Sequence, residues 1–175
     1  MNPRHNIFLI GMPGAGKSTL GKALTKRLGL TFTDADQEIV TRTGVSIATI
    51  FEIEGEASFR AREAQLIADL VTRERLVLAT GGGAILSEDS RRLMRDNGVV
   101  VYLRASLEDL ATRTARDTKR PLLQGANPAD ALRKLFQIRE PLYNETAHII
   151  IDTGRQHATK LAEQIADQLQ RDGYW

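Results

Sequence analysis

The stretch from Gly11 to Ser18 constrains the fold of this chain more than any other segment. It reads Gly-Met-Pro-Gly-Ala-Gly-Lys-Ser, which fits the pattern G-x-x-x-x-G-K-[ST], and it lies between an apolar run that ends at Ile10 and a helical pattern that begins at Lys17. Glycines in such a loop allow successive backbone N–H groups to turn inward around an anion, and a helix N-terminus adds a favourable dipole. The sequence therefore predicts a strand, a phosphate-binding loop and a helix in direct succession.

Apolar runs alternate with helical patterns along the rest of the chain. Runs bounded by turn residues predict strands at 6–10, 30–33, 76–79, 99–103 and 149–151. Helical patterns occupy 17–28, 46–71 with a break at Gly55, 87–97, a stretch that begins at Ser106, 128–144 with an end or kink at Pro141, and a last segment with Leu161, Ile165 and Leu169 on one face. Continuous apolar runs are typical of strands buried on both faces of a parallel sheet. We therefore expect an α/β chain in three layers, with a five-stranded parallel sheet flanked by helices.

Length and composition exclude several classes of protein. The 175 residues fit one domain, 1–175. The chain has no cysteine and its three histidines are scattered, which excludes thiol catalysis, disulfides and a zinc cluster. A net charge of +2 without a concentrated basic face argues against nucleic-acid binding, and the apolar runs are too short for a membrane span. We therefore expect a cytoplasmic monomer that binds neither nucleic acid nor membrane.

The phosphate-binding loop predicts a nucleoside triphosphate as ligand. In this motif Lys17 bridges the β- and γ-phosphates, and the Ser18 hydroxyl ligates Mg²⁺. The residues expected to contact the nucleotide here are Gly14, Ala15, Gly16, Lys17, Ser18 and Thr19. The chain lacks an N-K-x-D stretch for reading guanine, and it is short for a helicase or a transport ATPase. A small-molecule kinase fits these observations best.

Further motifs follow the loop along the chain. They read Asp34-Ala35-Asp36, Phe59-Arg60-Ala61-Arg62-Glu63, Gly81-Gly82-Gly83, Arg120-Pro121-Leu122-Leu123 and Arg139-Glu140-Pro141-Leu142-Tyr143. In type, place and order the set resembles the motifs of shikimate kinases, nearly from end to end. The resemblance implies a P-loop kinase fold with a substrate-binding insert at about 34–63 and a mobile lid at about 112–126. It also implies transfer of the γ-phosphoryl of MgATP to the 3-hydroxyl of shikimate, in aromatic amino-acid biosynthesis.

The resemblance assigns the acceptor site to a small set of residues. Asp36 would bind the substrate hydroxyls and serve as the candidate base. Arg60 and Arg139 would clamp the substrate carboxylate, because a planar guanidinium binds a carboxylate through two parallel bonds. Glu63, three residues after Arg60 on a helix, would hold that arginine in position. The Gly81–Gly83 run would allow the backbone to approach the substrate closely.

The resemblance assigns further residues to binding of the nucleotide and its metal ion. Asp34 would help Ser18 to place Mg²⁺, Arg120 is the lid arginine at the phosphates, and Arg113 would stack on the adenine. Gln156 stands where the family often carries an arginine, and it remains a candidate adenine contact. The catalytic set implied is Lys17, Asp36 and Arg120.

Simpler roles are also open to several of these residues. Asp34 or Asp36 could cap a helix that starts near Gln37, and Asp34 is the better candidate for a cap. Arg60 and Arg139 could each be an ordinary ion-paired arginine. At the level of function, the alternatives are another small-molecule kinase such as a gluconate or nucleoside monophosphate kinase, a nucleotide-binding regulator without catalysis, and a nucleic-acid-stimulated ATPase.

Overall fold

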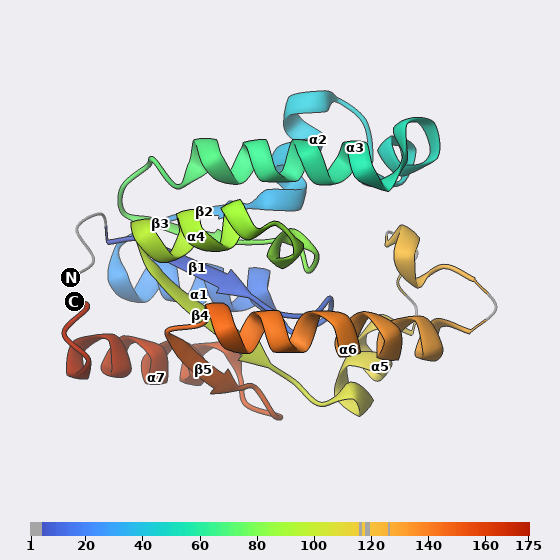
Figure 1. Cartoon of the computed structure of the whole chain (residues 1–175). Helices are drawn as coiled ribbons and strands as arrows, with labels where there is room; N and C mark the ends of the chain where they lie inside the picture. Colours follow the sequence, from blue (N-terminus) through green and yellow to red (C-terminus); the bar gives the residue numbers. More distant parts are fainter. Residues whose placement is uncertain (1–4, 116, 118–119, 126) are drawn as a thin grey trace.

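A five-stranded parallel sheet forms the centre of the molecule. The computed structural model describes residues 5–115, 117, 120–125 and 127–175. The strands are β1 (Ile7–Ile10), β2 (Thr31–Asp34), β3 (Leu76–Ala79), β4 (Val99–Arg104) and β5 (Ile149–Asp152). They lie in the order β2-β3-β1-β4-β5, and every pairing is parallel (Figure 1). The sheet predicted from the apolar runs is confirmed.

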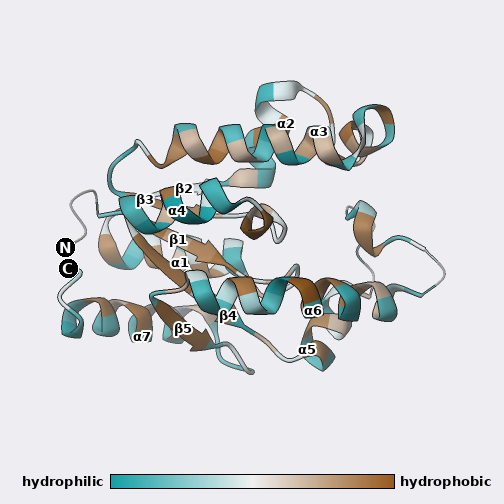
Figure 2. Ribbon diagram, viewed as in Figure 1, coloured by the Kyte–Doolittle hydropathy of each residue, from teal (hydrophilic) through white to brown (hydrophobic). Residues whose placement is uncertain are grey.

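Burial separates the central strands from the edge strands. All residues of β1 and β3 are buried, as are the first five of β4, and Figure 2 shows these strands in the brown of hydrophobic residues. The edge strands β2 and β5 both contain residues that are not buried. An edge strand needs fewer apolar side chains, which explains why the run at 30–33 is the weakest of the five in the sequence.

Helices cover both faces of the sheet. They are α1 (Lys17–Leu28), α2 (Ala35–Thr43), α3 (Ile47–Leu70), α4 (Glu88–Asn97), α5 (Leu107–Thr114), α6 (Pro128–Thr146) and α7 (Ala158–Arg171), with short 3₁₀ helices η1 (Ala84–Leu86) and η2 (Pro121–Leu123). Helices α1 and α7 pack against each other on one face, whereas α4 and α6 contact β4 from the other (Figure 1). This arrangement is the expected three-layer α/β fold.

Capping residues stand at the helix ends predicted near residues 28, 87 and 106. The hydroxyls of Ser87 and Ser106 accept hydrogen bonds from backbone N–H groups three residues further on, at the starts of α4 and α5. Gly29 ends α1 with a left-handed φ of 65°, a conformation that glycine adopts without a steric penalty. Local sequence therefore determines where these helices begin and end.

The sequence predicted that Pro141 ends or kinks its helix, and the first alternative is wrong, because the helix does not end there. Helix α6 runs on to Thr146 with Pro141 inside it. Tyr143 and Thr146 are buried, and the Thr146 hydroxyl donates to the Leu142 carbonyl at 2.7 Å. Tertiary packing of the last turn therefore outweighs the local cost of the proline.

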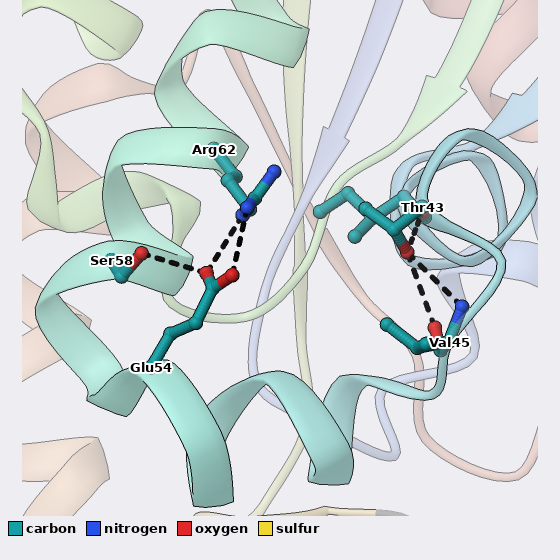
Figure 3. Close-up of polar contacts among 6 residues, drawn as sticks. Thr43, Val45, Glu54, Ser58 and Arg62 are labelled. Atoms are coloured by element: carbon teal, nitrogen blue, oxygen red, sulfur yellow. Dashed lines mark hydrogen bonds and ion pairs between the residues drawn. The ribbon is translucent and has the colours of Figure 1, made fainter.

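Helix α3 changes direction at Gly55, whose φ and ψ are 83° and 170°. The carboxylate of Glu54, just before the break, accepts bonds from Arg62 Nε at 3.0 Å and from Arg62 Nη2 at 2.9 Å. The Ser58 hydroxyl donates to the same carboxylate at 2.9 Å, so three donors beyond the break converge on one side chain before it (Figure 3). Arg62 is thus an exposed residue whose partner lies across the break, and the predicted break at Gly55 is confirmed.

We expect Gly55→Ala to destabilise the protein by about 1–3 kcal/mol, because the Gly55 backbone lies in a region of φ and ψ that is nearly restricted to glycine. No atom outside its chain neighbours lies within 4 Å of the added Cβ, so the cost is conformational rather than steric. Gly44→Ala is the matched control, since Gly44 also has open space but adopts the milder left-handed conformation at a φ of 73°. Chemical denaturation measures both variants, and a larger loss for Gly44→Ala would contradict the expectation.

Candidate active site

A cleft of about 1180 Å³ opens at the carboxyl ends of β1, β2 and β3. Its walls come from the phosphate-binding loop, α2, α3, the glycine run after β3, and residues 117 and 120–123. The carboxyl ends of parallel strands meet at one edge of a sheet, which is where α/β proteins bind ligands. The cleft gathers Lys17, Ser18, Asp34, Asp36, Arg60, Gly81, Gly82, Gly83, Arg120 and Arg139.

The phosphate-binding loop has the backbone that its glycines predict. Gly14 and Gly16 have φ values of 84° and 93°, in the left-handed region. The Lys17 ammonium donates to the carbonyls of Gly11 at 2.7 Å and Met12 at 2.9 Å, and the residue is only 8% exposed. Burial, followed by the positive charge of Arg120, lowers the pKa of Lys17 to about 7. The lysine is therefore a buried cation whose charge depends on what binds beside it.

Ser18 and Asp34 join the loop to the end of β2. The Ser18 hydroxyl donates to one carboxylate oxygen of Asp34. The other oxygen accepts from the Gln37 backbone N–H at 3.1 Å, so Asp34 also caps α2. The capping alternative and the metal-placing alternative are compatible, because they use different oxygens. A hydroxyl and a carboxylate at a phosphate site are the few hard oxygen ligands that Mg²⁺ takes from a protein, so these residues fit the ion.

The glycines after β3 make room for charged side chains. A Cβ on Gly81 would lie 2.7 Å from Glu63 Oε2 and 2.8 Å from Asp36 Oδ1. A Cβ on Gly83 would overlap the guanidinium of Arg60. Both contacts are closer than real Cβ contacts, so a side chain at either position would displace the charged groups from their places in the cleft.

Gly82 completes the same pattern. A Cβ there would lie 2.8 Å from Pro13 Cδ and 3.1 Å from Arg139 Nη1. The phosphate-binding loop and helix α6 therefore approach the glycine run from two sides. The sequence predicted a close approach to a ligand, and the structure adds a close approach to the protein's own charged groups.

Arg60 is held by Glu63, as the helical spacing predicts. Arg60 Nη1 lies 2.8 Å from Glu63 Oε1, and the guanidinium stacks over the Phe59 ring at 5.2 Å. Glu63 is 2% exposed and its Oε2 is buried without a hydrogen-bond partner. Burial raises the pKa of Glu63, and the charge of Arg60 opposes that shift. This cluster therefore holds a carboxylate whose second oxygen is free to accept a hydrogen bond.

Arg139 enters the cleft from α6. It is 3% exposed, and its Nε is buried without a hydrogen-bond partner. Burial lowers its pKa, and the nearby positive charge of Arg60 acts in the same direction. Asp36 balances the cluster from α2, and its own pKa is raised by burial and then by Asp34. Two arginine side chains that reach the same cleft favour an anionic ligand between them.

Arg120 faces the same space from the other wall. It forms an ion pair with Asp117 at 3.1 Å, and its charge acts on the pKa of both Lys17 and Asp36. The structure thus brings Arg120 to the cleft as expected. Of the predicted lid, residues 116, 118, 119 and 126 lie outside the described residues.

The two predicted adenine contacts lie apart from the cleft lining. Arg113 donates to the Gly14 carbonyl at 3.2 Å and to the Gly154 carbonyl at 3.1 Å. It therefore links the phosphate-binding loop to the loop before α7. Gln156 is exposed in that second loop, and its backbone N–H donates to the Thr153 carbonyl at 3.3 Å.

Tyr143 and Phe51 are site residues to which sequence analysis assigned no role. The Tyr143 hydroxyl donates to the Gly82 carbonyl at 2.5 Å. The signal was its position four residues after Arg139, which places both on one face of a helix. Phe51 lines the cleft and packs on Phe59 with ring centroids 4.9 Å apart, although its spacing predicted only a core position.

The fold and the cleft define a small P-loop phosphotransferase. A family model described as shikimate kinase matches residues 13–170. A shikimate kinase from Chromobacterium violaceum is 54% identical over 164 residues, covering 94% of this chain and 89% of the relative. One from Burkholderia lata is 49% identical over 172 residues, covering 98% and 94%. The chain belongs to the shikimate kinase family.

Solved structures agree with this assignment. The structure of a shikimate kinase from Acinetobacter baumannii in complex with shikimate superposes with a TM-score of 0.95 at 46% identity, covering 98% of this chain and 96% of that one. A gluconokinase from Sinorhizobium meliloti superposes with a TM-score of 0.54 at 19% identity, which shows a shared fold alone.

The low pKa of Lys17 predicts a pH-dependent stability in the protein without nucleotide. The unfolded chain keeps the Lys17 proton up to its ordinary pKa of 10.5, whereas the folded chain releases it near 7. Stability from this group is therefore present at high pH and is lost as the pH falls through about 7. Relative to Lys17→Met, the wild-type free energy of unfolding should rise between pH 7 and 9.5 by up to about 1.4 kcal/mol per pH unit. Urea titrations at several pH values measure the difference, and a constant difference would contradict the assignment.

Proposed function

We propose that this chain transfers the γ-phosphoryl of MgATP to the 3-hydroxyl of shikimate, which yields shikimate 3-phosphate and ADP for aromatic amino-acid biosynthesis. The observation that carries the proposal is the pair Arg60 and Arg139, which converge with Asp36 on the Gly81–Gly83 run in a member of the shikimate kinase family. Two arginines suit a carboxylate, and a neighbouring aspartate suits a hydroxyl.

The phosphate-binding loop holds the donor. Backbone N–H groups around Gly14 and Gly16, whose positive φ values are described above, surround the phosphates. The negative charge of the triphosphate favours the protonated form of Lys17, which then neutralises the β- and γ-phosphates. Ser18 and Asp34 would hold Mg²⁺, which would offset charge on the same phosphates. Arg113 and Gln156 contact the adenine on this proposal, since both lie at or near the loop before α7.

The acceptor lies on the opposite wall of the cleft. Arg60, fixed by Glu63, and Arg139 bind its carboxylate. Asp36 orients the attacking hydroxyl, and the raised pKa of this carboxyl suits a group that accepts a proton. Arg120 neutralises charge on the transferring phosphoryl group. Catalysis on this proposal is mainly positioning and charge neutralisation.

The proposed organisation is a single domain, 1–175, with the substrate insert at about 34–63 and the lid at about 112–126. Each residue in the proposed mechanism comes from one chain, so a monomer contains a complete site. In the part of the chain that the structure describes, none of the helices has the length and apolar character needed to span a membrane.

A panel of acceptors tests the proposal directly. ADP release is measured with MgATP and shikimate, quinate, gluconate, AMP or no acceptor. We expect strong stimulation by shikimate, because its carboxylate and hydroxyls match the two arginines and Asp36. Stimulation by gluconate or AMP in place of shikimate would overturn the acceptor assignment and leave the nucleotide site in place.

Replacement of either clamp arginine should weaken binding of the acceptor and leave binding of ATP nearly unchanged. We expect Arg60→Ala and Arg139→Ala to raise the KM for shikimate by about 10–100-fold, since each removes a charge-assisted pair worth about 1.5–3 kcal/mol. The KM for ATP should change by no more than about twofold. Arg62→Ala is the matched control, because Arg62 lies on the same helix as Arg60 but pairs with Glu54 outside the cleft. Steady-state kinetics measure both KM values. An equal rise in the KM for ATP would contradict the assignment of these arginines to the acceptor carboxylate.

A further inference from the structure

The three carbonyls of the glycine run are satisfied in different ways. The Gly81 carbonyl accepts from the Ala84 N–H at 3.1 Å, and the Gly83 carbonyl accepts from the Leu86 N–H at 3.1 Å. These two bonds form the 3₁₀ turn that continues the run. The Gly82 carbonyl instead accepts from a side chain far along the chain, the hydroxyl of Tyr143 on α6.

Tyr143 also contacts the acceptor clamp. The Arg139 guanidinium, which lies one helical turn earlier on α6, packs beside the same glycine, and the charge of Arg139 and the Tyr143 hydroxyl each affect the pKa of the other. Arg139 Nη1 would lie 3.1 Å from a Cβ placed on Gly82, so guanidinium and glycine are packed together. The Tyr143 hydroxyl therefore holds the backbone against which the Arg139 guanidinium packs.

Packing leaves the tyrosine ring little freedom to move. Tyr143 is 1% exposed, and its ring stacks on Tyr102 of β4 with centroids 5.0 Å apart and an interplanar angle of 25°. Residue 80, at the other end of the glycine run, is also fixed, because the Thr80 hydroxyl donates to the Leu9 carbonyl at 2.9 Å. The run is thus attached to the central sheet at one end and to α6 through Tyr143.

We propose that Tyr143 is a positioning residue for the acceptor: its hydroxyl fixes the Arg139 guanidinium relative to the Gly82 backbone and so determines the affinity for the acceptor carboxylate. The inference rests on the proposed function. Arg139 Nε has no hydrogen-bond partner and Arg139 sits close to the positive charge of Arg60. A guanidinium in that situation keeps its orientation only against fixed neighbours, and the Gly82 backbone held by the Tyr143 hydroxyl is such a neighbour.

Tyr143→Phe removes one oxygen atom and keeps the ring. We expect the KM for shikimate to rise roughly tenfold, because the Gly82 carbonyl is left without its donor and the backbone beside Arg139 is no longer fixed. The kcat and the KM for ATP should stay within about twofold of the wild-type values. Tyr102→Phe is the matched control, since it removes the hydroxyl of the other ring in the stack and keeps the bond to Gly82.

A purely structural role would give a different result. It would lower the melting temperature of both variants and affect both substrates alike. Thermal melts followed by circular dichroism therefore accompany the kinetics. An unchanged KM for shikimate in Tyr143→Phe, an equal rise in the KM for ATP, or the same rise in Tyr102→Phe would each overturn the inference.

A second variant tests whether the effect passes through Arg139. Arg139→Lys keeps the charge and removes the planar fork. In that background Tyr143→Phe should raise the KM for shikimate by a clearly smaller factor than in the wild type, because the group it positions is gone. An equal factor in both backgrounds would overturn the inference. A wild type that shikimate does not stimulate would instead overturn the proposed function, so the two failures are distinguishable.

Discussion

The close packing of charged side chains against a backbone without Cβ atoms organises this site. Glu63, Arg60 and Arg139 come from two helices, and all three reach positions that a side chain on residues 81–83 would occupy. The strand before the run is completely buried, so the run itself is anchored to the core of the sheet. The proposed acceptor half of the cleft therefore depends on a backbone element anchored in the core, as precise binding sites generally do.

Electrostatics in the cleft follow from this crowding. Burial disfavours every charge in the cluster, which raises the pKa of Asp36 and Glu63 and lowers that of Arg139. Opposite charges offset part of that cost within the cluster. An oxygen of Glu63 and a nitrogen of Arg139 nevertheless remain without partners. A ligand that carries an anionic group and hydroxyls supplies complementary partners, which is the chemistry of the proposed acceptor.

Much of the fold could be predicted from the sequence because its signals are local. The phosphate-binding loop, the capping serines and the break at Gly55 each depend on a few adjacent residues, and all were found. The site was predictable where motifs carried it, as for Arg60 and Arg139. The bond from Tyr143 to the Gly82 carbonyl spans 61 positions in the chain, and no local pattern encodes such a contact. Whether the helix ends or continues at Pro141 was left open for the same reason, since distant packing stabilises its last turn.

The lowered pKa of Lys17 has a consequence for the thermodynamics of nucleotide binding. Near pH 7 a substantial fraction of this lysine is neutral, whereas a triphosphate bound beside it, as proposed above, would favour the protonated form. Binding then takes up a proton from the solvent, and the buffer supplies it. The heat measured by calorimetry includes the ionisation enthalpy of that buffer, so phosphate and Tris would give different apparent enthalpies for the same complex. At a pH well below 7 the lysine is charged before the nucleotide arrives, and the two buffers would agree.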